Sequence, residues 1–369
     1  MKIVFAGGGT AGHINPALAI AQTVKEKNPH AEILFIGNQN SMEEKLVRHA
    51  GFEIKFIKIL GLNRKNPLKN IQTMRLFFKA VQDAKQMLKD FAPDLAVGTG
   101  GYVSAPVLFA ATKLGIHTCI HEQNAYPGLT SKMLARRVDK VFISFENSAP
   151  RFHDQSKLVL TGNPLRTEFQ SADRAQSRKT LGLSEEDFYV LSFGGSLGAT
   201  ALNKAMCGVL EKNAKTHDFC QCHAMGKLGR DWMPQTLLQG GVDIQKADKW
   251  ITVKDFIYDM SCQMAAADVV ICRSGAITLG EVMAQGKPAV LIPSPNVTHN
   301  HQYYNAMSLV ERDAALLLEE KDLSSERLYE MLLSLKNDPQ RRRQLSANAK
   351  KMALPTAAQT IYEEMMSLL

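Results

Sequence analysis

The sequence has no long hydrophobic run and few cysteines. No apolar segment reaches the 18 residues that a membrane-spanning helix needs. No basic and apolar leader with a cleavage site is apparent, so we expect a protein of the cytoplasm. The six cysteines, at positions 119, 207, 220, 222, 262 and 272, are irregularly spaced, which argues against a disulfide framework and predicts reduced thiols. The segment from Cys220 to His223 lacks the second pair of ligands of a tetrahedral zinc site, and we interpret it as a buried strand.

The sequence does have a regular alternation of short apolar runs with longer helical patterns. Such alternation is typical of βαβ units and parallel sheets. With 369 residues the chain exceeds the size of one ordinary core, so we expect two domains. The pattern starts again after Pro164, in the turn-rich segment LTGNPLRTEF. The predicted strands are KIVFAG, EILFIG, DLAVGTGG, HTCIHEQ and KVFISF in the first sheet, and YVLSF, CQCHAMG, ITVKDF, DVVICRSGA and PAVLIP in the second.

Positive charge is concentrated in one part of the chain. The formal net charge is +8, and residues 61–90 contribute seven Lys or Arg against two Asp, a local excess of +5. A basic segment of this kind predicts a basic face and an anionic partner.

The opening strand leads into a glycine-rich turn, Gly7-Gly8-Gly9-Thr10-Ala11-Gly12, followed by His13. The spacing fits G-x-G-x-x-G, which holds a dinucleotide pyrophosphate at a helix N-terminus. A dinucleotide site also needs an acidic residue at the end of the next strand, and EILFIG ends in Asn-Gln-Asn instead. A dinucleotide also leaves His13 unexplained, so the pattern disfavours NAD or FAD.

A second glycine turn, in residues 268–288, is more informative. A strand ends at Cys272, Arg273-Ser274-Gly275 forms the turn, and a helix begins near Ala276. The N–H groups and dipole of such a helix end bind phosphate. Glu281 follows within two turns, where its carboxylate can accept hydrogen bonds from two vicinal hydroxyls, as in a ribose. Together they predict a nucleoside diphosphate site, although Glu281 taken alone is equally an exposed helix residue.

Further motifs complete this pattern. The segments GGGTAGH, GTGGYVS, HEQN, GNPLR, GGSLGA, CRSGAITLGE and HQYYNA occur in this order along nearly the whole chain. In this the sequence resembles the MurG glycosyltransferases, which transfer N-acetylglucosamine from UDP-GlcNAc to lipid I and so make lipid II for peptidoglycan. The resemblance implies an α/β chain of GT-B fold, with parallel sheets of two Rossmann-like domains facing a central cleft. We expect domains at 1–163, joined by a C-terminal helix at 350–369, and at 164–349, with lipid acceptor on the first and UDP donor on the second.

The resemblance also implies the donor contacts. Two positions depart from the family pattern, Ala11 where glycine is usual and Gly280 where a small hydroxyl residue is common. The implied contacts are Thr10, Ala11, Gly12, Asn124, Arg166, Ser196, Ile257, Ala276, Ile277, Thr278, Leu279, Gly280, Glu281 and Gln302.

The α-linked donor and β-linked product of this family imply a single displacement with inversion at the anomeric carbon. His13 is the candidate base for the C4 hydroxyl of the acceptor, and its alternative role is to hydrogen-bond acceptor or phosphate. No two aspartates stand two positions apart, so the D-x-D metal clamp is absent and we expect no metal or other cofactor. A UDP-GlcNAc 2-epimerase of the same fold and a sugar-nucleotide binding module remain as alternatives.

The basic segment acquires a role through the same resemblance. On a helix, Phe77, Ala84 and Leu88 form a stripe suited to the core. We predict that the adjoining arc docks on anionic lipid at the cytoplasmic face of the bacterial plasma membrane, where the lipid acceptor lies; the alternative is a wide amphipathic helix with solvated lysines. We expect no nucleic-acid partner. The predicted membrane face comprises Ile71, Arg75, Phe78, Val81 and Lys85, with Lys89 on the same arc and Leu62, Arg64, Lys65 and Leu68 leading into it.

Overall fold

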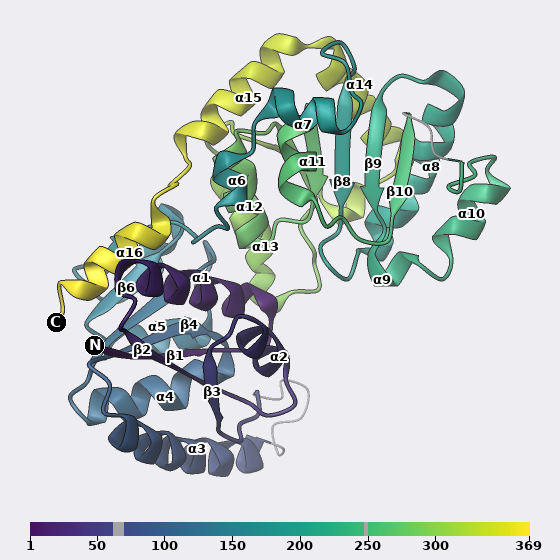
Figure 1. Cartoon of the computed structure of the whole chain (residues 1–369). Coiled ribbons are helices and arrows are strands. Elements are labelled where there is room, and N and C mark those ends of the chain that lie inside the picture. Colours follow the sequence, from purple (N-terminus) through teal and green to yellow (C-terminus); the bar gives the residue numbers. More distant parts are fainter. Residues whose placement is uncertain (62–69, 247–249) are drawn as a thin grey trace. The chain divides into compact units, whose positions relative to one another are not determined.

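The computed structural model describes residues 1–61, 70–246 and 250–369. The chain divides into two compact units, of which unit 1 comprises Met1–Leu165 with Leu354–Leu369 and unit 2 comprises Arg166–Ala353 (Figure 1). The expected boundaries, 163/164 and 349/350, lie two and four residues earlier. Asn163 lies in unit 1 as expected, where it is buried and its amide nitrogen donates to the carbonyl of Gln123 at 3.2 Å.

Unit 1 is built on a parallel sheet with the strand order β3-β2-β1-β4-β5-β6-β7. Its strands are nearly continuous apolar runs, as expected for strands covered on both faces. The strands are β1 Lys2–Gly7, β2 Glu32–Gly37, β3 Glu53–Phe56, β4 Leu95–Gly100, β5 His117–Glu122, β6 Lys140–Ile143 and β7 Leu158–Leu160. The helices are α1 Ala11–Lys27, α2 Met42–His49, α3 Asn70–Phe91, α4 Gly101–Lys113, α5 Leu129–Ala135, the 3₁₀ helix η2 Glu146–Arg151, and α16 Ala357–Met366.

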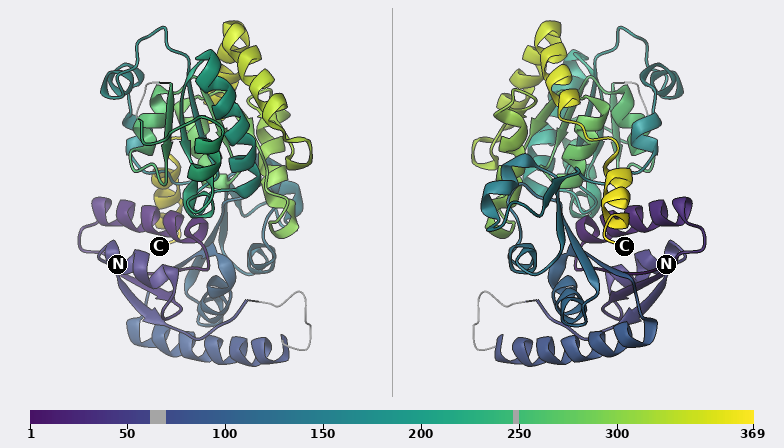
Figure 2. Two further views of the ribbon diagram at one scale, coloured as in Figure 1. Left: turned by 90° about the vertical axis from the view of Figure 1, so that its right-hand side faces the viewer. Right: turned by 90° about the vertical axis from the view of Figure 1, so that its left-hand side faces the viewer.

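Two apolar layers cover the faces of this sheet. Alternate residues of β1 point to opposite faces, so that Ile3 joins a cluster with α1 and α16 and Val4 joins one with α3 and α4. Figures 1 and 2 show these helix pairs on opposite sides of the sheet. The C-terminal helix expected at 350–369 is shorter in the structure, where α16 packs on unit 1 with Ile361 fully buried and Glu364 paired with Lys140 at 2.5 Å.

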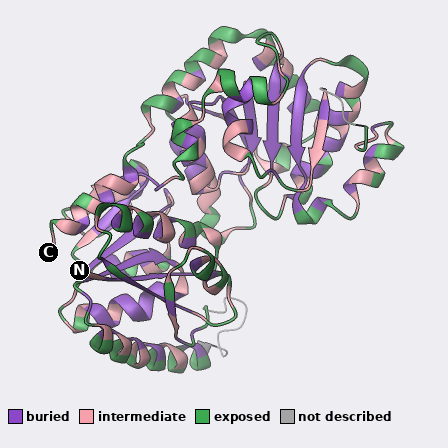
Figure 3. Cartoon of the chain, viewed as in Figure 1, coloured by how far each residue is buried: buried purple, intermediate pink, exposed green. Residues whose placement is uncertain are grey.

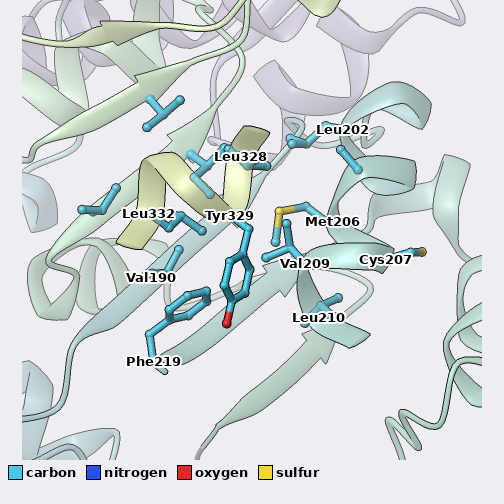
Figure 4. Close-up of a cluster of buried hydrophobic side chains, with 14 of the residues drawn as sticks. Val190, Leu202, Met206, Cys207, Val209, Leu210, Phe219, Leu328, Tyr329 and Leu332 are labelled. Atoms are coloured by element: carbon cyan, nitrogen blue, oxygen red, sulfur yellow. The ribbon is translucent and has the colours of Figure 1, made fainter. Parts of the chain in front are cut away.

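Unit 2 repeats the plan with a parallel sheet of order β10-β9-β8-β11-β12-β13. Its largest apolar cluster packs α8 and α14 against the sheet, with Leu202, Met206, Phe219, Tyr329 and Leu332 buried together (Figure 4). Figure 3 shows the strands of both sheets as largely buried. The strands are β8 Tyr189–Phe193, β9 Cys220–Ala224, β10 Ile251–Lys254, β11 Val269–Cys272, β12 Ala289–Leu291 and β13 Leu316–Leu317. The helices are α6 Glu168–Ser171, α7 Arg174–Thr180, α8 Thr200–Thr216, α9 Gly226–Gly229, α10 Met233–Gln239, α11 Met260–Ala266, α12 Ala276–Gln285, η3 Thr298–Asn300, α13 His301–Val310, η4 Glu320–Asp322, α14 Ser325–Asn337 and α15 Pro339–Lys351.

All ten predicted strands are present, and the prediction of two Rossmann-like sheets is confirmed. Three short strands, β3, β7 and β13, have no counterpart in the prediction. They lie at sheet edges and have four, three and two residues, which is too short for a periodic pattern.

Candidate functional site

In each sheet there is one point from which consecutive strands are added in opposite directions. In unit 1 this point lies between β1 and β4, and in unit 2 between β8 and β11. Ligands of open parallel sheets bind outside the carboxyl ends of the strands at such a point. The glycine turns of the sequence follow these strands, and the fold therefore brings them to the position where each unit is best able to bind.

The turn of unit 1 is tightly built. Gly9 has a φ of +85°, and Thr10 is extended and precedes the first helical residue of α1, Ala11. The backbone of Ala11 is therefore ordinary helix, so this position accepts a methyl group and does not need glycine. Gly12 is exposed in the first turn of the same helix.

His13 is held by this turn through one ring nitrogen. Its Nδ1 lies 3.0 Å from the carbonyl oxygen of Gly8 and 3.3 Å from Oγ1 of Thr10. Because a carbonyl can only accept, Nδ1 carries the hydrogen, and the lone pair of the neutral ring lies on Nε2. A Cβ at Gly100 would lie 2.8 Å from Cδ2 of this ring, so the glycine of the β4 turn makes room for it.

A carboxylate from α2 lies against this turn. Glu43, on α2 and 1% exposed, accepts from the backbone N–H groups of Gly9 and Asn38, each at 3.3 Å. A Cβ at Gly8 would approach the same carboxylate to 2.7 Å. The protein's own carboxylate therefore fixes the glycine turn, a contact that no local pattern indicates because 34 residues separate Glu43 from Gly9.

The residues of the HEQN motif form a mainly buried hydrogen-bond network within unit 1. Glu122 accepts from the backbone N–H groups of Asn124 at 2.9 Å and Gly128 at 3.0 Å. His121 lies 2.9 Å from the carbonyl of Gly162, and burial lowers its pKa to about 4. The neutral ring then accepts from the amide of Gln123 at 3.0 Å. Asn124, the predicted donor contact, is half-buried at the rim of this network.

The turns of unit 2 enclose a cavity of about 470 Å³ instead. This is a volume typical of small-molecule sites. Three predicted donor contacts line it together, Ser196 from the β8 turn, Thr278 from α12 and Gln302 from α13. Thr10, Ala11, Gly12 and Asn124 belong to unit 1 and do not take part in this cavity.

The N-terminus of α12 lies at this cavity. Its first residue is preceded by Gly275, which lines the cavity and has no side chain to cap the helix. The first-turn N–H groups of a helix have no carbonyl within it, and they carry its positive dipole end. The hydroxyl of Ser274 is buried in the same turn without a partner among the described residues. This arrangement is suited to a phosphate group.

Only some residues of the segment from Ala276 to Glu281 are accessible to solvent. Ala276, Leu279 and Gly280 are buried, and Ile277 and Glu281 are half-buried. Glu281 lies one turn beyond Thr278, and burial raises its pKa to about 7, although the nearby charge of Arg166 lowers it. Arg166 itself pairs with Glu168 at 2.8 Å. Neither Arg166 nor Glu281 lines the 470 Å³ cavity.

Several residues at this cavity were not predicted from the sequence. Arg273 lines it, pairs with Glu320 and donates to the carbonyl oxygens of Ile292 and Pro293 at 3.1 and 3.2 Å.

Two predicted contacts have structural surroundings of their own. Gln302 accepts from the backbone N–H of Ser294 at 2.9 Å, which holds the loop after β12 against α13. Ile257, another predicted contact, is 3% exposed between β10 and α11.

The predicted membrane face lies on α3. Ala84 and Leu88 are buried and Phe77 partly buried, as predicted for the core stripe. Ile71 and Phe78 are each 60% exposed. The neighbouring Met74 is 46% exposed, Arg75, Lys85 and Lys89 are exposed, and Val81 is partly buried against the core (Figure 3). Leu62, Arg64, Lys65 and Leu68 lie outside the described residues.

Membrane-spanning helices and metal-binding clusters are both absent from the residues that the structure describes. No described helix is both long and apolar enough to cross a bilayer. No group of three or more His, Cys, Asp or Glu among residues 1–61, 70–246 and 250–369 could hold a metal ion. Cys220 and Cys222 are buried, and His223 bonds to Ser192 and Asn203, at 2.9 and 3.1 Å.

The similarities to known proteins follow the two units. Residues 3–143 match the glycosyltransferase family 28 N-terminal domain, and residues 189–361 match the glycosyltransferase family 28 C-terminal domain. The chain is 42% identical over 363 residues to UDP-N-acetylglucosamine--N-acetylmuramyl-(pentapeptide) pyrophosphoryl-undecaprenol N-acetylglucosamine transferase of Acetivibrio thermocellus, covering 98% of this chain and 97% of that relative. It is 41% identical over 369 residues to a Bacillus thuringiensis enzyme of the same name, numbered 2, covering 100% and 99%.

Solved structures agree with this similarity. The structure of Acinetobacter baumannii MurG has a TM-score of 0.78 at 28% identity, over 99% of each chain. The UDP-GlcNAc 2-epimerase of Neisseria meningitidis, at 13% identity, has a TM-score of 0.70 over 100% of each chain. At that identity the second likeness concerns the fold alone.

Proposed function

Because this chain belongs to glycosyltransferase family 28 and, within it, to the MurG family of GT-B enzymes, it is a UDP-GlcNAc-dependent hexosyltransferase of peptidoglycan synthesis, and we propose how its residues carry out the transfer. The substrates are UDP-GlcNAc and lipid I, and the product is lipid II. In the proposed mechanism the C4 hydroxyl of the MurNAc residue attacks the anomeric carbon of the donor from the face opposite UDP, which inverts its configuration.

The observation that carries the donor part is the cavity at the β8 and β11 turns. It brings the side chains of Ser196, Thr278 and Gln302 together with an uncapped helix N-terminus in one volume of about 470 Å³. The diphosphate binds at the N-terminus of α12, where N–H groups and dipole stabilise its negative charge. The ribose hydroxyls donate to Glu281, which lies one turn beyond Thr278 on the same helix.

His13 serves as the base. Its Nδ1–H donates to the carbonyl of Gly8, which leaves Nε2 to accept the proton of the acceptor hydroxyl. As that proton moves to Nε2, the hydroxyl oxygen bonds to the anomeric carbon and the bond from that carbon to the diphosphate oxygen breaks. UDP leaves with the electron pair, and the end of α12 stabilises the charge that develops on it.

We propose that this stabilisation needs no metal ion, since the D-x-D clamp is absent from the sequence and α12 supplies a positive end. Transfer rates measured with and without EDTA test this point. Equal rates are expected, and a rate abolished by EDTA and restored by Mg²⁺ would contradict it.

The activity itself is tested by incubation with UDP-GlcNAc, with and without a lipid-linked muramoyl acceptor. Transfer predicts UDP release and a GlcNAc-extended product only when the acceptor is present. An epimerase would instead change the sugar without acceptor, and a binding module would leave the donor intact. Either of these two outcomes would overturn the assignment.

We also propose that α3 docks unit 1 on the cytoplasmic leaflet. The exposed side chains of Ile71 and Phe78 beside Arg75 and Lys85 form an apolar face framed by cations, as interfacial helices require. Each basic residue near an anionic surface contributes about 1 kcal/mol.

Vesicle co-sedimentation tests this docking. Binding should rise with phosphatidylglycerol content and fall with salt, and an Ile71→Ser/Phe78→Ser variant should bind less while using a soluble acceptor analogue normally. A Gln82→Ser variant, at an exposed polar position of the same helix, is the matched control. Equal vesicle binding by the double variant and the native protein would refute the docking face.

A further inference from the structure

Unit 2 contains a second cavity, of about 500 Å³, at the opposite edge of its sheet. Its lining includes Asp268 and Pro288, which directly precede β11 and β12, whereas the donor cavity lies where β8 and β11 end. Five basic residues line it against one carboxylate, that of Asp268. The five are Arg174, Lys287, Arg342, Arg343 and Lys350.

Some of this charge has a structural task. Three helices end at the cavity, and cations donate to their last carbonyl groups. Lys287 donates to Ala265 at 2.6 Å at the end of α11, Lys350 donates to Ala284 of α12, and Arg342 donates to Lys336 of α14 at 2.7 Å. Cations are favourable at such negative helix ends. The bonds therefore explain why some basic side chains gather here.

The positive charge nevertheless exceeds what the structure uses. Asp268 pairs with Arg174 at 2.8 Å and with the buried Arg178 at 3.2 Å, which brings the cations around the cavity to six. A helix end carries about half a negative charge, so these three ends and Asp268 offset about 2.5 of the six positive charges and leave about 3.5. Arg343 is exposed and has no hydrogen bond or ion pair among the described residues.

Lys287, which is 6% exposed, is affected first by its burial and second by this positive charge. Burial, and then the positive charge of Arg174, lower its pKa to about 7, although Asp268 opposes this; Arg178 and Lys350 lower it further. The cations therefore destabilise one another. A bound anion would remove that repulsion and favour the protonated lysine.

We propose that this basic cavity binds a small multivalent phosphate group, of the size of pyrophosphate or larger. Arginine side chains suit phosphate because they donate two parallel hydrogen bonds. Gln170, Gln285 and Ser346 add neutral polar groups to the lining. Phe169 is only 1% exposed and offers no surface on which a base could stack, so recognition rests on the phosphate.

This site is separate from the donor site, although α12 connects them. Gly275, which precedes the helix, lines the donor cavity, and Gln285, its last residue, lines the basic cavity. Because pyrophosphate would also bind at the N-terminus of α12, the experiment is carried out on protein saturated with UDP.

Isothermal titration of inorganic pyrophosphate into this UDP-saturated protein should show one site per chain. Ser346→Glu and Arg343→Glu, which place negative charge at the cavity without removing a described side-chain contact, should each weaken binding at least tenfold. Lys204→Glu, at an exposed lysine that lines a different cavity, should leave it within twofold of native. Circular dichroism and UDP affinity confirm that each variant is folded.

Absence of pyrophosphate binding up to millimolar concentrations, or equal weakening by the control, would overturn the proposal. Phosphatidylglycerol vesicles, used with the Ile71→Ser/Phe78→Ser background, identify the source of the phosphate. If Arg343→Glu reduces vesicle binding as well as pyrophosphate binding, lipid headgroups reach the cavity. If it reduces only pyrophosphate binding, the natural ligand is soluble.

Discussion

Units 1 and 2 share a strand order and place a glycine turn at the same point of the sheet, but they use that point differently. In unit 1 the turn is occupied by the protein itself, with Glu43 bonded to Gly9 and His13 bonded to Gly8. In unit 2 the equivalent turns surround a cavity of about 470 Å³. A single fold thus holds the proposed base His13 in one copy and forms a cavity in the other.

The difference teaches that a glycine turn is not by itself a phosphate site. At Gly8 the missing side chain makes room for the carboxylate of Glu43, and at Gly100 for the imidazole of His13. At Gly275 the missing side chain instead leaves the start of α12 open to the cavity. The neighbouring side chains, rather than the turn, decide which role results.

Among the variants predicted here, removal of the His13 imidazole should have the largest effect on the transfer rate. His13→Asn should lower kcat by roughly 10² or more, because general base catalysis contributes about that factor. The KM for donor should change little, since the proposed donor cavity lies in unit 2. Steady-state kinetics measure both, with His30→Asn, an exposed histidine of unit 1, as control. A near-normal kcat with an unchanged pH profile would make His13 a structural residue.

Removing the acid of unit 2 should affect binding instead. Glu281→Ala should raise the donor KM by about 10- to 100-fold, since unfilled hydrogen-bonding capacity costs on the order of 1 to 3 kcal/mol. Glu330→Ala, at an exposed position of α14, is the matched control. Unchanged donor kinetics in a folded Glu281→Ala protein would remove this residue from the donor site.

The raised pKa of Glu281 predicts that this residue makes the stability of the protein depend on pH. Its value of about 7 lies above the ordinary 4.5, so the folded state holds a proton that the unfolded state releases between these values. The free energy of unfolding should therefore fall as pH rises from 4.5 to 7. Glu281→Gln should remove that loss. At pH 8 the free energy of unfolding of this variant, measured by urea titration, should exceed that of the native protein by on the order of 2 kcal/mol.

The same ionisation predicts a pH dependence of donor binding. Only the carboxylate accepts two hydroxyl hydrogen bonds, so donor affinity should decrease as pH falls through about 7. Glu281→Gln should lack this dependence. A native protein whose donor affinity is constant between pH 6 and pH 8 would contradict the proposed role.

Glu43→Gln would test whether the turn of unit 1 depends on its internal carboxylate. The new amide nitrogen would face the N–H of Gly9 or Asn38, leaving donors opposed, and we expect a loss of stability of about 1 to 2 kcal/mol. The kcat should fall with it, because the turn also positions His13. Glu26→Gln, at an exposed position of α1, controls for the loss of one charge. Unaltered stability and kcat would mean that the turn holds its shape unaided.

The smallest effect is expected at Ala11. This residue is the first of α1 and has no positive φ, so Ala11→Gly should cost less than about 1 kcal/mol of stability and leave the transfer rate near native. Thermal unfolding and kinetics check this. A gain in donor affinity would reveal that the methyl group restricts the loop after all.

The sequence was most informative where residues follow a period. Strands such as KIVFAG and DVVICRSGA were recognisable because they are continuous apolar runs between turn residues. The core stripe of α3, with Ala84 and Leu88, followed from helical periodicity. The order of seven motifs was enough to indicate the family. The three short edge strands, β3, β7 and β13, offered no such pattern.

By itself the sequence determined the two Rossmann-like sheets, the positions of their glycine turns, the basic helix and the family. Only the tertiary structure decided what fills each turn, because Glu43 reaches Gly9 across 34 residues and Arg273 reaches Glu320 across 47. It also gathered six cations from α7, the start of β12 and α15 around one cavity, although their sequence positions have no common pattern. Periodicity describes which face of an element is apolar, whereas the partner of a buried charge is set by contacts between elements that are distant in the chain.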